Sequence, residues 1–161
     1  MYNSDMEEEI LIILAGDNHR RCEPMTDLLK MYPDAALFLH IGDSEQSAAE
    51  LAGWICAAGN NDYDPGFPLE QVIQAGAHRI LLVHGDRLIY RGGYTALAAA
   101  GMEHGCDIVC FGHTHRYADK TVSGIRLLNP GSLSYNRDGS GTGYMEIRIH
   151  GNDIRATRKY M

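Results

Sequence analysis

The sequence has no long apolar run that would place it in a membrane. Its longest apolar stretches, such as Ile10–Ala15 and 80–83, are far shorter than the roughly 18 residues that a membrane-spanning helix needs. The first nine residues are acidic and polar, whereas a secretory signal starts with basic residues and continues into an apolar run. We therefore expect no membrane association and a cytoplasmic location.

Cysteine is also scarce, and its spacing argues against two kinds of protein. The four cysteines form no Cys-x-x-Cys pair. A structural zinc site rich in cysteine needs closely spaced thiolates, and a small disulfide scaffold needs a denser framework of cysteines. The observed spacing is typical of reduced, mostly buried thiols in a cytosolic protein.

Basic residues are too few for a protein that covers a nucleic-acid polymer. The chain has 14 lysines and arginines against 21 acids, which gives a formal net charge of −7 with histidine neutral. Broad nucleic-acid-binding faces are basic because they neutralise phosphates, so we expect no such polymer as a partner. With 161 residues, 45% of them apolar, and no linker or repeat, the sequence predicts a single folded domain over 1–161.

Short apolar runs alternate with helical patterns over the first two thirds of the chain. They predict buried strands at 10–14, 35–41, 54–57, 79–83 and 107–111, and helices at 24–31, 45–51 and 94–104. The last third predicts antiparallel strands at 117–122, 125–128, 143–149 and 153–160, separated by turn signals. Together the two patterns predict an α/β fold, a two-sheet β-sandwich flanked by helices in the layer order α-β-β-α.

Five of the predicted strands are each followed by polar residues of the kind that bind metals. These residues are Asp17, His19, Asp43, Asn60, His84, His113 and His115. Because loops at the carboxyl ends of parallel strands converge, we expect the seven side chains to form one cluster. Two pairs, 17/19 and 113/115, are spaced by two, so in an extended backbone each pair would point toward one centre.

The chemistry of the seven side chains predicts two divalent metal ions. Imidazoles, carboxylates and an amide oxygen suit Mn²⁺, Fe²⁺ or Zn²⁺, and the donor types do not choose among them. Our expectation is Mn²⁺ first, with Fe, Ni or Zn as alternatives. Seven ligands are too many for one tetrahedral ion and suit two ions that share a carboxylate. The positive charge of two such ions would exceed the negative charge of the two carboxylates, so the site would attract a small phosphate ester. Paired ions also lower the pKa of bound water, so the seven residues are the predicted catalytic residues.

The residues that follow these strands resemble a known family in both order and form. The segments are Asp17-Asn18-His19, Gly42-Asp43, Gly59-Asn60-Asn61-Asp62, His84-Gly85 and Gly112-His113-Thr114-His115. They resemble the calcineurin-like metallophosphoesterases. The short chain and the segment Asn129-Pro130-Gly131-Ser132 look most like the small YfcE-type phosphodiesterase group.

The resemblance implies a specific assignment of the metal ligands. The first ion would be held by Asp17, His19, Asp43 and His115, and the second by Asp43, Asn60, His84 and His113. Asp43 would bridge the two ions, and a hydroxide between them would attack phosphorus. The implied fold is a two-sheet sandwich with the metals at one edge, as the patterns also predict.

Two positions depart from the family pattern. Many members have a histidine directly after the metal-binding asparagine, where it is thought to help the leaving group, but this chain has Asn61. An amide is no general acid near neutral pH, so His40 or a metal-bound water would have to substitute. We therefore predict better activity on diesters, or on esters with good leaving groups, than on alkyl monoesters. Asp86 stands where a histidine commonly follows His-Gly and would place an extra acid near the pocket.

Asn60, Asn61 and Arg20 are the candidates for binding substrate, although Arg20 also fits an ordinary solvated position. Each motif alone has a simpler interpretation, such as a helix cap at Asp17 or a turn at 59–62. The main alternative function is a non-catalytic metal-binding scaffold, because the light subunit of the retromer coat is similar in fold and is regarded mainly as a binding module. Scaffold members tend to lose a metal-binding histidine, whereas all seven positions are filled here, which favours an enzyme. The sequence leaves open whether the protein forms a homo-oligomer.

Overall fold

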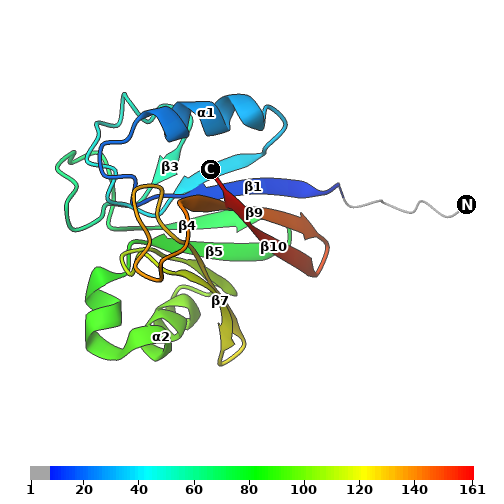
Figure 1. The fold of residues 1–161 in the computed structure, drawn as a ribbon. Coiled ribbons are helices and arrows are strands. Elements are labelled where there is room, and N and C mark those ends of the chain that lie inside the picture. The colour runs from blue at the N-terminus through cyan, green and yellow to red at the C-terminus, as the bar shows by residue number, and fades with distance from the viewer. Residues whose placement is uncertain (1–7) are drawn as a thin grey trace, which may run out of the picture.

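Two five-stranded sheets pack against each other in the computed structural model, which describes residues 8–161 (Figure 1). The first sheet has the strand order β10-β9-β1-β2-β3 and the second has the order β4-β5-β6-β8-β7. Apolar side chains from both sheets form one buried cluster between them, to which Ile12 and Met145 contribute from the first sheet and Ile80 and Leu128 from the second. The expected two-sheet sandwich is confirmed.

The first sheet is built around β1 (Ile10–Ala15). It pairs in parallel with β2 (Leu37–His40), which pairs in parallel with the two-residue β3 (Ile55–Cys56). On its other side, β1 pairs antiparallel with β9 (Gly143–His150), and β9 pairs antiparallel with β10 (Asp153–Tyr160). The continuous apolar run of β1 suits a central strand that is covered on both faces.

The second sheet has three parallel strands at its centre. They are β5 (His78–Val83), β6 (Ile108–Cys110) and β8 (Ile125–Pro130). The two edge strands, β4 (Glu70–Ala75) and β7 (Tyr117–Val122), pair antiparallel with their neighbours. The strand β4 is absent from the sequence-based prediction because its apolar residues are few and half of its side chains face solvent.

One helix covers the outer face of each sheet (Figure 1). The helix α1 (Glu23–Met31) shares a buried cluster with β1 through Leu28 and Ile13. The helix α2 (Asp86–Glu103) shares another with β5 through Leu97 and Leu81. The layer order α-β-β-α is therefore confirmed. Neither helix within residues 8–161 has the length and hydrophobicity needed to cross a membrane.

The predicted helix at 45–51 is wrong, because acidic side chains from a later segment bind its backbone. The segment forms turns instead. The carboxylate of Asp62 accepts the N–H of Glu45 at 2.8 Å, and the carboxylate of Asp64 accepts the N–H of Ala48 at 2.7 Å. Such bonds compete with helix formation. The other helices are present, although α2 begins at Asp86 rather than at 94.

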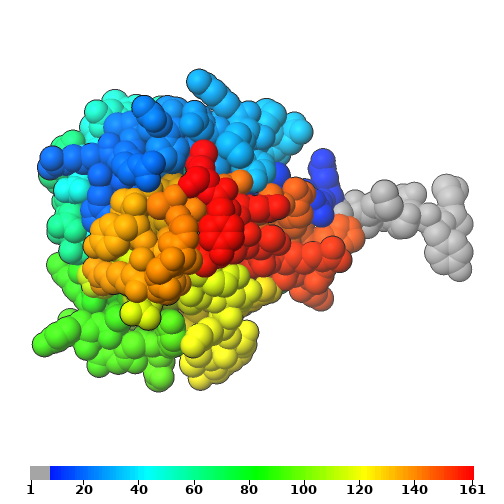
Figure 2. Space-filling model, viewed as in Figure 1, coloured from blue at the N-terminus to red at the C-terminus, as the bar shows by residue number. Residues whose placement is uncertain are grey.

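At the edge where β1 ends, the loop that follows β8 packs on the segment after β1. The space-filling view shows this loop in orange beside the blue surface of the earlier segment (Figure 2). The hydroxyls of Ser132 and Ser134 donate to the carbonyl oxygen of Asp17 at 2.7 and 2.8 Å, and the N–H of Leu133 donates to the carbonyl of Gly16 at 3.2 Å. These bonds fix the backbone at residue 17.

Candidate metal centre

The seven predicted ligands come from both sheets and meet at one edge of the sandwich. Loops of the first sheet carry four of them, after β1, β2 and β3, and loops of the second sheet carry three, after β5 and β6. The first four are Asp17, His19, Asp43 and Asn60, and the other three are His84, His113 and His115. The structure brings all seven into one connected group through the contacts described below.

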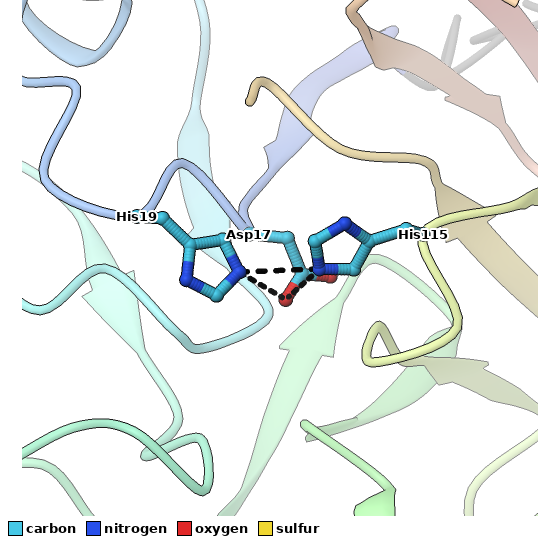
Figure 3. Close-up of side chains that lie close together, drawn as sticks. All are labelled: Asp17, His19 and His115. Carbon is cyan, nitrogen blue, oxygen red and sulfur yellow. Dashed lines mark hydrogen bonds and ion pairs between the residues drawn. The ribbon is translucent and has the colours of Figure 1, made fainter. Parts of the chain in front are cut away.

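Asp17, His19 and His115 form the first of two overlapping groups (Figure 3). Asp17 Oδ1 lies 3.5 Å from His115 Nε2 and 3.9 Å from His19 Nε2, and the two Nε2 atoms are 3.1 Å apart. The other ring nitrogen of each histidine faces an oxygen: His115 Nδ1 lies 2.9 Å from the carbonyl of Tyr135, and His19 Nδ1 lies 3.2 Å from a carboxylate oxygen of Glu45. Such second bonds leave Nε2 free to bind a metal.

Asp17, Asp43 and His84 form the second group. His84 Nε2 lies 3.4 Å from Asp43 Oδ2 and 4.0 Å from Asp17 Oδ1, while its Nδ1 lies 2.8 Å from the carbonyl of Ile41. Asn60 Oδ1 joins this group at 3.0 Å from His84 Nε2, and it also lies 3.2 Å from His113 Nδ1. The second group thus extends through Asn60 to His113.

The fit of these residues to a cation rests on one atom, Asp17 Oδ1. This oxygen is buried and has no hydrogen-bond partner among residues 8–161, whereas Oδ2 of the same carboxylate accepts the N–H of His113 at 3.0 Å. A buried carboxylate oxygen without a partner is costly, and ion binding is one of the few ways to compensate for it. Three imidazole Nε2 atoms lie within 4.0 Å of it. The donor set therefore fits one or more divalent cations.

Asn61 contacts Asp43 in this structure rather than an open pocket. Its backbone N–H donates to Asp43 Oδ1 and its amide nitrogen donates to Asp43 Oδ2, both at 2.9 Å. Burial alone would raise the pKa of Asp43, but the hydrogen bonds from His84 and Asn61 hold that pKa well below its ordinary range. The predicted substrate-binding residue is thus placed to keep a predicted metal ligand ionised.

The histidines of the second group differ in the direction of their pKa shifts. Burial alone would lower the pKa of His84, but the carboxylates of Asp43 and Asp17 outweigh it and raise the pKa to about 9. Burial, helped by the neighbouring His84, lowers the pKa of His113. An imidazole that is held protonated by carboxylates occupies a place where a cation is favoured, so the electrostatics agree with the geometry.

Strained backbone places several of these side chains. Positive φ angles occur at Asp17 (47°), His19 (42°), Asp43 (57°), His113 (70°) and His115 (53°). Residues other than glycine rarely adopt such angles, and those that do are concentrated at functional sites. The expectation that His113 and His115 point together along an extended backbone is therefore wrong. His113 joins Asn60, whereas His115 joins Asp17 and His19.

Two glycines allow the loops to approach the carboxylates closely. A Cβ on Gly59 would collide with the carboxylate of Asp43, and a Cβ on Gly112 would collide with Ile41 and approach Asp17 Oδ2. Close approach of backbone is a usual reason for glycine beside a ligand site. These two positions therefore need glycine for space rather than only for a turn.

His40 is not available as a general acid. It is completely buried, and burial lowers its pKa to about 4. The N–H of Gly42 donates to His40 Nδ1 at 3.0 Å, and His40 Nε2 lies 2.7 Å from the side-chain oxygen of Asn18. Because Nδ1 accepts a hydrogen bond, the ring proton is on Nε2, and this N–H donates a hydrogen bond to the side-chain oxygen of Asn18. The suggestion that His40 replaces the missing histidine is therefore wrong, since both ring nitrogens support the loops behind the site.

Sequence reasoning missed two supporting residues, Asp62 and Glu45, and one residue that it did predict, Arg20, lies outside the ligand group. Asp62 accepts the N–H groups of Asp43 and Gly59 at 2.8 and 2.7 Å, and its place in the motif at 59–62 was a usable signal. Nothing in the sequence pointed to Glu45 as a partner of His19. Arg20 is 76% exposed and lies 3.8 Å from Glu45, so its guanidinium stands outside the ligand group.

Comparison with known proteins gives matches over most of the chain. Residues 10–152 match the model of the calcineurin-like phosphoesterase superfamily domain. The chain is 32% identical over 158 residues to a probable metallophosphoesterase of Methanothermobacter thermautotrophicus, which covers 91% of this chain and 90% of that protein. It is 27% identical over 152 residues to the probable metallophosphoesterase YsnB of Bacillus subtilis, with 92% and 89% covered.

Solved structures give the same fold at lower sequence identity. A predicted phosphoesterase of Streptococcus pneumoniae superposes with a TM-score of 0.82 at 22% identity, over 94% of this chain and 99% of that one. An archaeal phosphodiesterase superposes with a TM-score of 0.72 at 17% identity, over 93% and 100%. At these identities the likeness shows the fold alone.

Proposed function

The chain belongs to the calcineurin-like phosphoesterase superfamily, as its motifs predict, and from this premise we propose that it is a phosphodiesterase that uses two divalent metal ions. The observation that carries the proposal is the buried, unpartnered Oδ1 of Asp17 among the Nε2 atoms of three histidines. A fold that only needed packing at this edge would not keep a carboxylate oxygen in that state.

The seven residues divide between two proposed ions. Asp17, His19 and His115 would hold the first ion, and His84, Asn60 and His113 would hold the second. Asp43 is the proposed shared ligand, which is supported by the position of its Oδ2, 3.4 Å from His84 Nε2 and 3.9 Å from His19 Nε2. Mn²⁺ is the first choice, with Fe, Ni or Zn as alternatives, and imidazole and oxygen donors suit all of these metals.

The chain's own residues prepare this site in two ways. Hydrogen bonds at Nδ1 of His19, His84 and His115 turn Nε2 of each ring inward. Asn61 keeps Asp43 ionised, so the carboxylate is ready to bind a cation. When bound, two divalent ions supply the charge that holds the phosphoryl oxygens and lower the pKa of bound water.

The preference for diesters rests on the absence of a free acid at position 61. The amide of Asn61 bonds to Asp43, and both ring nitrogens of His40 are engaged elsewhere. Neither can protonate a poor leaving group, so we expect turnover of bis(p-nitrophenyl) phosphate and very little of glycerol phosphate or other alkyl monoesters. Comparable rates on the two kinds of ester would contradict this preference.

The proposal is tested on protein that has been stripped of metal with a chelator. Mn²⁺, Ni²⁺, Zn²⁺ or Mg²⁺ is added back, and release of p-nitrophenolate from bis(p-nitrophenyl) phosphate is measured. We expect activity only with added metal, and loss of it in His113→Ala. His150→Ala is the matched control, because His150 is exposed on β9 and bonds to none of the seven residues. Absence of both activity and tight metal binding would favour the non-catalytic scaffold instead.

A further inference from the structure

A groove of about 530 Å³ begins at the proposed metal centre and runs along the start of α2. Two of the proposed ligands, Asn60 and His113, line one part of it. Asp86, Arg87, Tyr90 and Arg91 of α2 line the rest. We call these six residues the arginine groove. None of the α2 residues belongs to the ligand set, so the proposed function leaves them without a role.

The two arginines of this groove have no acidic partner in the part of the chain that the structure describes. Arg87 and Arg91 are one helical turn apart, so their side chains lie on the same face of the helix. Both are exposed, and within residues 8–161 neither makes an ion pair or a side-chain hydrogen bond. Other arginines do find partners: Arg126, for example, pairs with Asp119 at 3.0 Å.

The rest of this helical turn supports a binding role. Leu88 and Ile89 pack against the buried cluster under α2, so the segment is fixed on its inner side. Tyr90, by contrast, is 93% exposed beside the arginines. A backbone break at Gly92 and Gly93 separates this turn from the rest of α2. The turn therefore presents two guanidinium groups and one aromatic ring to the groove.

The charges in the groove favour an anion. Asp86 contributes one negative charge and the two arginines contribute two positive ones, in a protein whose formal net charge is −7. Guanidinium groups match the geometry of phosphate oxygens, and an exposed aromatic ring can stack on a planar base. A positive groove that opens into a phosphate-ester site is suited to a second anionic group of the same substrate.

We infer that the arginine groove binds a second phosphate of the substrate, and that the preferred substrates are nucleotide phosphodiesters that carry such a phosphate. This inference rests on the proposed function for the position of the scissile phosphate. Arg87 and Arg91 hold the second phosphate, and Tyr90 contacts the base.

A binding experiment tests the inference without relying on turnover. Isothermal titration calorimetry in the presence of Mn²⁺ compares thymidine 3′,5′-bisphosphate with thymidine 5′-monophosphate. We expect the bisphosphate to bind roughly tenfold more tightly, the size of effect that about 1.4 kcal/mol produces. Arg87→Gln and Arg91→Gln should each reduce this ratio, and the double variant should bring it close to one. Arg155→Gln, which alters an exposed arginine on β10, should leave the ratio unchanged.

Kinetics then separate this inference from the proposed function. The matched substrates are the p-nitrophenyl ester of thymidine 5′-phosphate with and without a 3′-phosphate. The 3′-phosphate should raise kcat/KM through a lower KM, and the double variant should lose this gain but still hydrolyse bis(p-nitrophenyl) phosphate. Equal binding of the two nucleotides by the unaltered protein, or a ratio that survives the double substitution, would overturn the inference. A binding ratio without any hydrolysis would support the groove and refute the phosphodiesterase.

Discussion

At the scale of single residues, Asp17 is where stability and function conflict. Its Oδ1 is buried without a partner, while its Oδ2 and its carbonyl oxygen are both bonded. A buried carboxylate oxygen that accepts no hydrogen bond opposes folding of the metal-free protein, even with imidazoles 3.5–4.0 Å away. The residue is therefore retained at a cost in stability, as expected for a side chain whose partner is a bound ion.

Asp17→Asn should stabilise the metal-free protein and weaken metal binding. The amide keeps the shape of the side chain, removes the charge and can direct its N–H groups at the surrounding Nε2 atoms. We expect the free energy of unfolding in urea with chelator to rise by about 1–3 kcal/mol. Calorimetric titration with Mn²⁺ should show an affinity lower by roughly 100-fold.

An exposed aspartate provides the control for this substitution. Asp153→Asn changes a side chain that pairs with Arg155 on the surface of β10, so both measurements should stay the same. If Asp17→Asn lowers stability in the presence of chelator, the unpartnered oxygen is not costly, and the argument for a cation at this atom fails.

Sequence reasoning identified the seven candidate ligands because each follows an apolar run. It could not show their arrangement, which depends on backbone angles that no spacing rule contains. His113 and His115 both have positive φ and contact different ligands, and Asn61, from the loop after β3, donates two hydrogen bonds to Asp43. Glu45 carried no signal at all, since its contact with His19 bridges residues that are far apart in sequence.

At the scale of elements, the pair His78–Asp107 joins the starts of β5 and β6. His78 Nδ1 lies 2.5 Å from an Asp107 oxygen, and its Nε2 lies 2.9 Å from the carbonyl of Gly151 in the turn between β9 and β10. Burial alone would lower the pKa of His78, but the bonds to Asp107 and Gly151 raise it above its usual 6.5. Burial would raise the pKa of Asp107, but His78 and the N–H of Arg79 lower it below 3.8.

These shifts predict a window of pH in which the pair stabilises the fold. Because folding raises the pKa of His78, its contribution is complete below pH 6.5 and is lost as pH rises through the pKa of the folded state. Because folding lowers the pKa of Asp107, its contribution is present above pH 3.8 and is lost as pH falls through its folded value. The difference in unfolding free energy between the unaltered protein and Asp107→Asn should be largest between these limits.

Urea unfolding at several pH values measures this difference. We expect it to stay below about 1 kcal/mol, because Asp107 is half exposed and solvent screens the pair. Asp153→Asn removes an ion pair that contains no histidine. The difference in unfolding free energy between the unaltered protein and this variant should therefore not fall as pH rises above 6.5. A difference that is constant across the whole range would mean that the pair does not titrate with folding.

The break in α2 gives a second prediction for an element. Gly93 has φ 60° and ψ −140°, a conformation that side chains oppose even though no atom lies within 4 Å of a Cβ built there. Gly93→Ala should therefore lower the free energy of unfolding by about 1–3 kcal/mol through the backbone alone. Ala99→Gly, at an exposed position in the regular part of α2, should cost only about 1 kcal/mol.

The elements themselves could be predicted wherever local pattern decided the structure. The apolar runs of β1 and β5 and the alternation of β9 identify strands without any tertiary information. The segment 45–51 could not be predicted, because two of its N–H groups donate to Asp62 and Asp64, which belong to a later loop. Such long-range hydrogen bonds from side chains override the local propensity for a helix.

At the scale of the whole molecule, the candidate metal centre connects the two sheets. Asp17, His19, Asp43 and Asn60 belong to loops of the first sheet, and His84, His113 and His115 belong to loops of the second. Contacts between ligands of the first sheet and ligands of the second, such as His19 Nε2 to His115 Nε2 at 3.1 Å, therefore cross from one sheet to the other. Ions bound here would link the two halves of the sandwich and be lost when the halves separate.

Metal binding should consequently stabilise the entire fold rather than only the loops. A ligand that binds the folded state alone adds about 2.7 kcal/mol when its concentration is 100 times its dissociation constant. We expect the thermal unfolding temperature of the metal-free protein to rise as Mn²⁺ is added and to keep rising slowly after the sites are filled, because the added free energy grows with the logarithm of the metal concentration. His150→Ala should follow the same curve, because its side chain is exposed and it follows Ile149, which pairs with the start of β1, whereas Asp17 and His19 follow the end of β1. In Asp17→Asn the same shift should need roughly 100-fold more Mn²⁺, because the oxygen that lies among the three Nε2 atoms is replaced. If Mn²⁺ stabilises this variant as much as the unaltered protein, the metal binds elsewhere, and the centre between the sheets is not its site.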